Sequence, residues 1–255
     1  MRRYGALRSD RVPAGGVHFA HLVGSAADIP DHVEQDEIIY DQGQAGSCWA
    51  WSYAGCGDSW MRWNGLPWQK SSALAAYKLA RMFMAGDPDV ALTDGGTDAA
   101  AGVESLRRYG VMPETLYPYT DDPTQGLNDR LNLFDLERMS VAKLDGFAAI
   151  LDTGAARVAA IRACIAAKIP VGIAIPVYDN FEAISNADTY DRPAGKLHGG
   201  HAIRVSGYRP GAFRITNQWS ENWGASGFAW LSERFVAEEA WDPYALRFAP
   251  ITGAP

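Results

Sequence analysis

The chain has 255 residues, of which 47% are hydrophobic and 21% charged, and its formal net charge is −7. This composition is typical of a globular protein and excludes an intrinsically disordered one. The acidic balance, with no block of basic residues, argues against nucleic-acid and membrane partners, and the apolar runs fall short of the roughly 20 residues that a spanning helix needs.

The cysteines and the N-terminal residues indicate whether the protein binds a metal and in which cellular compartment it is expected. Cys48, Cys56 and Cys164 have the spacing of neither a disulfide framework nor a zinc site, so we expect no metal or other cofactor. Charged residues interrupt residues 4–16, where a signal peptide requires a continuous apolar core. We therefore expect a cytoplasmic protein, or one delivered without a recognisable signal peptide. The oligomeric state stays open.

Residues 1–35 mix glycine, proline, alanine and charge without helical or strand periodicity, which predicts an extension wrapped on the surface. The remaining residues, 36–255, form the predicted catalytic domain. The acidic stretch at residues 31–37 is interpreted as a solvated face and not as a calcium site.

The first part of this domain, about residues 36–118, is predicted to be mainly helical. A buried helix should start after Ser47, with chemistry at its first turn, and a second should span residues 71–85. A third should follow Gly95 and Gly96, with Thr97 as its N-cap and Gly110 at its end.

The second part, about residues 119–255, is predicted to be mainly β. Residues 121–150 show turn signals and little periodicity, and residues 154–168 follow a helical pattern. Short runs of β-branched or aromatic residues follow, separated by glycines and prolines. These predicted strands are residues 171–177, 201–208, 212–216 and 227–231. The fold class is thus α+β, a helical half and an antiparallel, barrel-like β half with a cleft between them.

Cys48 is the candidate nucleophile. A cysteine in the first turn of a helix is exposed to the positive end of the helix dipole and to unpaired backbone N–H groups, which favour thiolate. For Cys56 and Cys164 we expect ordinary buried packing, as for most free cysteines.

A thiolate needs a proton-transfer partner and a residue that orients this partner. His201 begins one predicted strand and Asn217 ends the next, and the short connection over residues 207–211 should pair the two strands. The hairpin should therefore bring His201 and Asn217 together.

These residues resemble the papain and cathepsin family of cysteine proteases. Residues 42–49, Gln-Gly-Gln-Ala-Gly-Ser-Cys-Trp, match the segment that opens the family's central helix, and Gln42 lies six residues before Cys48. The pair His201-Ala202 and the run from Asn217 to Gly224 match its histidine and asparagine segments. The resemblance extends from about Ile38 to Leu231 and looks closest to bacterial members without disulfides.

The resemblance implies a papain-like two-part fold and a cysteine endopeptidase that acts on peptide or protein substrates. Cys48, His201, Asn217 and Gln42 would be catalytic, with Gln42 as an oxyanion donor. Gly95, Gly96 and Trp219 would contact substrate or line its cleft. The specificity pocket would involve Thr97, Asp98, Ala174, Gly199 and Ala202, and its preferred side chain stays open.

Alternatives and departures accompany this interpretation. The same triad could serve a transpeptidase or an amidase, or the fold could persist in a catalytically silent binding protein. Gln218 and Ser220 replace a serine and a glycine of the family's asparagine segment, changes expected to leave the triad atoms untouched. His198 and His201 could suggest a metal pair, but the glycines between them and the lack of a third nearby ligand argue against a metal.

Overall fold

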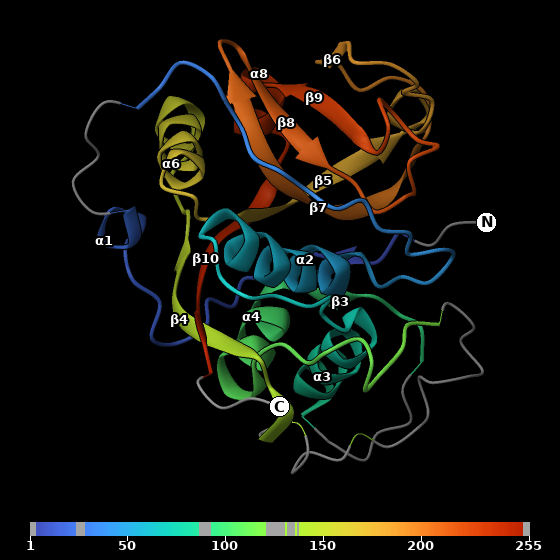
Figure 1. Ribbon diagram of the computed structural model, residues 1–255. Coiled ribbons are helices and arrows are strands. Elements are labelled where there is room, and N and C mark those ends of the chain that lie inside the picture. The colour runs from blue at the N-terminus through green and yellow to red at the C-terminus, as the bar shows by residue number, and fades with distance from the viewer. Residues whose placement is uncertain are drawn as a thin grey trace.

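In the computed structural model, residues 4–23, 29–86, 93–120, 131, 136 and 138–251 are described. The predicted turn signals at residues 121–126 lie outside these ranges. The helical half consists of α2 (Cys48–Trp63), α3 (Ala73–Ala85) and α4 (Ala99–Tyr109); α2 crosses the middle of the molecule in Figure 1, and α3 and α4 lie below it. The predicted helical half is confirmed.

The ends of these helices follow from local chemistry. The Ser72 hydroxyl accepts a hydrogen bond from Ala75 N and caps α3, which ends at Gly86 with a left-handed φ of 68°. The predicted N-cap of α4 was wrong by one residue, because the Asp98 carboxylate and not Thr97 accepts the Ala101 N–H. Aspartate is among the best N-caps, which explains the difference.

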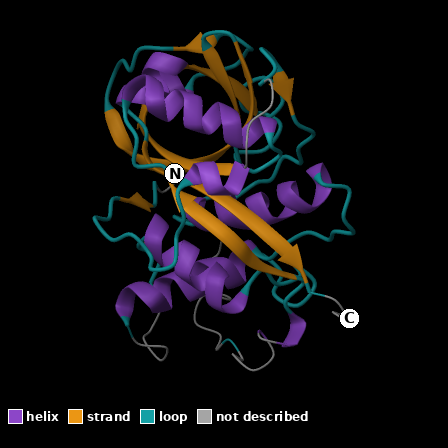
Figure 2. Cartoon of the chain, turned by 90° about the vertical axis from the view of Figure 1, so that its left-hand side faces the viewer, coloured by secondary structure: helices purple, strands orange, loops and turns teal. Residues whose placement is uncertain are grey.

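The β half contains an eight-stranded sheet that curves around its own core, as Figure 2 shows. Seven of its strands follow the order β4-β10-β5-β7-β8-β9-β6, and β2 also pairs with β7. Their bounds are β2 (Val33–Glu34), β4 (Ala142–Ala149), β5 (Val171–Tyr178), β6 (Thr189–Tyr190), β7 (Leu197–Arg209), β8 (Ala212–Thr216), β9 (Phe228–Ser232) and β10 (Trp241–Pro250). β4 and β10 were not predicted, and the four predicted strands correspond to β5, β7, β8 and β9.

Short helices and one long helix surround this sheet: α1 (Phe19–Val23), α6 (Gly154–Ala166), α7 (Asp179–Glu182) and α8 (Glu233–Glu238). The largest apolar cluster lies inside the β half, where valine and isoleucine of β5 and β7 pack with Phe181, Phe213 and Trp219. A second cluster joins α2 and α4 to β4 and β10. The two clusters make the halves one packed body.

Helix α2 lies between the two halves (Figure 1) and packs against α3 on one side and β7 on the other. Gly55 permits its close approach to β7, because a Cβ there would lie 2.0 Å from Arg204 Nη1. Arg204 is buried and forms a 3.0 Å ion pair with Glu37. The acidic stretch at residues 31–37 is therefore not simply a solvated face: Glu34, Asp36 and Glu37 pair with Arg214, Arg62 and Arg204.

The predicted surface extension was only partly correct. Residues 8–20 are mostly exposed, but Gly5 and Ala6 are buried. Ala6 and Leu7 form strand β1 (Ala6–Leu7), which pairs in parallel with β3 (Thr97–Asp98), at the beginning of α4. A two-residue strand has no periodicity by which the sequence could have indicated it.

Candidate active site

Cys48 is the first residue of α2 and is fully buried. Backbone amides of Ala202 and Gly5 hydrogen-bond to its sulfur. Ala202 follows His201 on β7, so the thiol lies against the strand that carries the histidine. Burial raises the pKa of the Cys48 thiol to about 11, against the smaller lowering effect of these amides. Burial of Cys48 thus favours the neutral thiol over the thiolate.

His201 and Asn217 meet as the hairpin predicted. Strands β7 and β8 pair antiparallel, and His201 Nε2 lies 2.8 Å from Asn217 Oδ1. The backbone N–H of Gln218 also donates to Asn217 Oδ1, at 2.9 Å. Since that N–H can only donate, its partner is the amide oxygen, and His201 Nε2 must then be the donor in its own hydrogen bond. The imidazole nitrogen that can exchange a proton with a thiol is therefore Nδ1.

Trp219 covers this hydrogen bond. Its ring stacks on the His201 imidazole with centroids 4.5 Å apart and an interplanar angle of 26°. Phe181 and Trp223 pack edge-on against Trp219 from the protein side, at 5.8 and 5.5 Å. This aromatic cluster excludes water from the His201–Asn217 pair and restricts rotation of the imidazole.

Gln218 approaches His201 and Asn217 more closely than the sequence suggested. Its side-chain Nε2 donates to Ala202 O at 2.6 Å and lies 3.5 Å from His201 Nε2. The expectation that this departure leaves the triad atoms untouched was therefore wrong. The fully buried Gln218 amide thus links the Ala202 carbonyl, next to His201, to the segment that carries Asn217.

Gln42 is fully buried next to the same site. Its backbone N–H donates to Gln218 O, and Ser220 N donates to Tyr40 O, so residues 40–42 are attached to the segment that holds Asn217. The Gln42 side-chain Nε2 donates to Ala45 O at 2.9 Å. An amide nitrogen carries two hydrogens, which leaves one for a second acceptor.

Gly95 and Gly96 lie on the opposite side of the cleft. Asp94, which precedes them, accepts hydrogen bonds from Gly46 N at 2.8 Å and from Tyr77 Oη at 2.7 Å. Gly96 has a φ of 76°, and a Cβ there would lie 2.4 Å from Gly5 O. Only glycine permits this approach of two backbones.

The chain's own N-terminal segment, residues 4–11, fills the cleft. Thr97 N donates to Gly5 O at 2.9 Å, and a Cβ on Gly5 would lie 1.9 Å from Gly46 O. The Tyr4 ring packs near His198 and Trp219, with centroids 5.9 and 6.1 Å away. The segment thus passes over Cys48 from the Trp219 side to β3, and the sequence offered no motif for it.

His198 does not form a metal pair with His201. Its Nε2 lies 2.6 Å from Asp179 Oδ1 and 3.6 Å from Glu182 Oε2. Across the described ranges, no group of three or more His, Cys, Asp or Glu residues could hold a metal ion. Nor does this part of the chain contain a helix long and apolar enough to cross a membrane.

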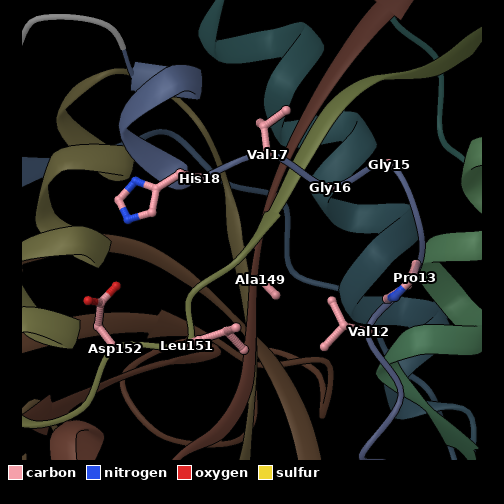
Figure 3. A pocket seen from close by; sticks show the side chains of 9 residues that line it. All are labelled: Val12, Pro13, Gly15, Gly16, Val17, His18, Ala149, Leu151 and Asp152. Atoms are coloured by element: carbon pink, nitrogen blue, oxygen red, sulfur yellow. The ribbon is translucent and has the colours of Figure 1, made fainter.

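Cys56 and Cys164 are fully buried free thiols, as expected of packing residues. A separate groove of about 510 Å³ lies between residues 12–18 and the end of β4, where Val12, Ala149 and Leu151 line it (Figure 3). None of the predicted site residues lines this groove. We therefore assign no catalytic role to this groove.

Comparisons with known proteins point in one direction. Residues 28–239 match the model of a family described as papain family cysteine protease. The chain is 24% identical over 229 residues to mouse cathepsin J, covering 80% of this chain and 61% of that protein. It is 39% identical over 74 residues to a gut-specific cysteine proteinase of Caenorhabditis elegans, which is 28% of this chain and 22% of that protein. The chain thus spans less than two thirds of these relatives.

Solved structures agree on the fold. Xylellain, a cysteine protease from Xylella fastidiosa, superimposes with a TM-score of 0.74 at 21% identity, covering 97% of both chains. Bromelain from Ananas comosus in complex with the E64 inhibitor gives 0.63 at 18% identity, covering 86% of this chain and 99% of that one. The α+β fold expected from the resemblance is confirmed, whereas the bacterial type of member stays a prediction.

Proposed function

Since the chain belongs to the papain family of cysteine proteases, we propose that it is a cysteine endopeptidase that hydrolyses peptide bonds through Cys48, His201 and Asn217. One observation carries the proposal: His201 Nε2 donates to Asn217 Oδ1 at 2.8 Å in a buried pair, which leaves Nδ1 for the thiol. The position of Cys48 at the start of α2, beside the amide of Ala202, supports the same roles.

The reaction follows from these roles. His201 Nδ1 takes the proton of the Cys48 thiol, and the thiolate attacks the peptide carbonyl carbon, forming a carbon–sulfur bond. The Cys48 backbone N–H and Gln42 Nε2 donate to the resulting oxyanion. His201 returns the proton to the amine nitrogen as the carbon–nitrogen bond breaks, which leaves a thioester. Water, deprotonated by His201, then hydrolyses the thioester and regenerates the thiol.

The closed state requires one further step in this proposal. Residues 4–7 occupy the space that a peptide would need, and burial raises the pKa of the Cys48 thiol to about 11. Departure of the segment would admit water and substrate and lower this pKa, which is the condition for the expected thiolate–imidazolium pair. We infer that the described state is an inactive form of the enzyme.

Product analysis tests the function. A full-length chain carrying Gly5→Val, which cannot keep residue 5 against Gly46 O, is incubated with a denatured protein in H₂¹⁸O and a reductant. We expect internal cleavage with ¹⁸O in each new carboxyl group, and no cleavage after Cys48→Ala.

Other outcomes identify the alternatives. Products that carry an added amine in place of ¹⁸O would indicate a transpeptidase, and deamidated side chains without cleavage would indicate an amidase. No product at all, with Gly5→Val folded, would favour a silent binding protein.

A further inference from the structure

The N-terminal segment makes its charged contacts at one end of the cleft, beyond β1. There the Arg8 guanidinium lies over the Trp241 ring, 4.6 Å from its centroid. Arg11 Nη2 forms a 2.6 Å ion pair with Asp98 Oδ2. The Ser9 backbone amide hydrogen-bonds to the Asp242 carboxylate. Arg8 is therefore bound by an aromatic ring and Arg11 by a carboxylate, and a second carboxylate, that of Asp242, holds the backbone between them.

The residues that contact this end of the segment, Asp98, Trp241 and Asp242, lie next to the proposed catalytic centre. Leu7 pairs with Asp98 in the β1–β3 register. Ala6 belongs to the same apolar cluster as Cys48 and Ala202, and Trp241 packs against that cluster. A Cβ on Gly200 would lie 2.4 Å from Ala6 O and 2.8 Å from the Trp241 ring. The arginine-binding residues thus lie next to the part of the cleft that a substrate would occupy.

The electrostatics of the two carboxylates favour a cation. Burial, helped by the nearby Asp98 carboxylate, raises the pKa of Asp242 to about 6, against the lowering effects of the Ser9 amide and the Arg8 charge. The Asp98 side chain is only 7% exposed, and its second oxygen is already used to cap α4. Asp242 Oδ2 is buried and has no hydrogen-bond partner among the described residues. When the segment leaves, both carboxylates lose their positive neighbours.

We propose that Asp98, Trp241 and Asp242 form a substrate subsite that selects a basic, arginine-like side chain. This subsite rests on the proposed protease function, and it implies that the substrates of the protease carry a basic side chain near the scissile bond. In the closed state Arg8 and Arg11 occupy the subsite; in the open state a substrate side chain takes their place. The guanidinium gains a cation–π contact with Trp241 and an ion pair with one or both carboxylates.

The test uses the full-length chain with the subsite vacated by Gly5→Val, Arg8→Gln and Arg11→Gln. Two peptidyl vinyl sulfones are compared, identical except for arginine or citrulline at the second or third residue from the electrophile. Citrulline has nearly the shape of arginine without its charge. The rate constant for modification of Cys48 is measured by intact-mass spectrometry. We expect the arginine reagent to react about tenfold faster.

Variants that remove the charges of the two carboxylates show whether these carboxylates cause the preference for arginine. Asp98→Asn together with Asp242→Asn should bring the arginine-to-citrulline ratio close to one. Asparagine caps helices as well as aspartate and tolerates the positive φ of 47° at residue 242, so the fold should persist. Asp188→Asn, an exposed acid elsewhere, is the matched control and should keep the ratio. Ala6→Glu, which buries a charge among apolar neighbours, provides a second opened chain if Gly5→Val does not fold.

Each outcome has one meaning. A ratio near one in the opened chain, or a ratio that survives both asparagine substitutions, would overturn the subsite. Failure of both reagents to modify Cys48 in either opened chain would overturn the proposed protease function, and the subsite with it.

Discussion

The two surfaces that enclose Cys48 are built differently. On one side, β7 is hydrogen-bonded to both β5 and β8, and His201 lies beneath an aromatic cluster of Phe181, Trp219 and Trp223. On the other side, residues 4–7 are held by a two-residue strand pairing and by close contacts of glycine backbones. The side formed by β5, β7 and β8, which we call the strand wall, belongs to the core. The N-terminal segment can leave the cleft without disrupting the hydrogen bonds between these strands.

The strand wall should carry the largest effect, because it holds the proposed base. In the opened chain, His201→Ala removes the proton acceptor and should lower kcat/KM for a peptide substrate by about 10³–10⁴-fold. His198→Ala is the matched control, since His198 lies on the same strand but pairs with Asp179. Equal losses in the two variants would show that the wall is only structural.

The N-terminal segment should respond to the loss of its charged contacts. In the otherwise native chain, Arg8→Gln with Arg11→Gln removes the cation–π contact and the ion pair with Asp98. Partly exposed contacts of this kind contribute modestly, so the rate of Cys48 modification by a neutral peptidyl epoxide should rise about threefold to tenfold. Arg192→Gln, an exposed arginine paired with Asp191, should leave the rate unchanged.

A buried carboxyl on α2, which is not part of the strand wall, should make stability depend on pH. Asp58 accepts hydrogen bonds from Tyr40 Oη and from Ser71, and burial raises its pKa to about 6. The folded state therefore binds this proton more tightly than the unfolded chain. Consequently, the free energy of unfolding should increase, by about 1 kcal/mol, as the pH falls from 7.5 to 5.

Denaturant titrations at the two pH values measure this difference. Asp58→Asn should reduce it, because asparagine does not titrate. An unchanged pH dependence in this variant would assign the effect to other groups.

The smallest expected effect lies at the edge of the wall. Ser220 has a φ of 65°, a conformation that costs energy for any residue with a Cβ. Ser220→Gly should raise the free energy of unfolding by about 0.5 kcal/mol, since relief of strain is partly offset by the entropy of glycine in the unfolded chain. Ser185→Gly, at an exposed serine without positive φ, should not stabilise; a gain there as large as at Ser220 would contradict the strain explanation.

The sequence predicted the strand wall far better than the segment that faces it. The β-branched runs at residues 171–177 and 201–208 and the short connection over residues 207–211 have local physical meanings, and the corresponding strands β5, β7 and β8 formed. Residues 4–7, which pass over Cys48, have no such signal in the sequence. Their position depends on the close contacts of Gly5 and Gly96 and on a few backbone hydrogen bonds. Asp242 and Trp241 were likewise missed, since only the pairing of β10 with β5 brings them to the cleft. The partners of residues 34–37 lie too far along the chain for any local pattern to indicate them.

We propose that Cys48 is the nucleophile of a protease whose cleft is closed by the protein's own residues 4–7. The most direct measurement is the rate at which a peptidyl epoxide modifies the intact chain, followed by digestion to locate the adduct, in the native protein and in Gly5→Val. A Cβ at residue 5 would lie 1.9 Å from Gly46 O, so we expect at least about a hundredfold faster modification of Cys48 in the variant and none after Cys48→Ala. Equal rates in both chains, or adducts on Cys56 or Cys164, would contradict the account.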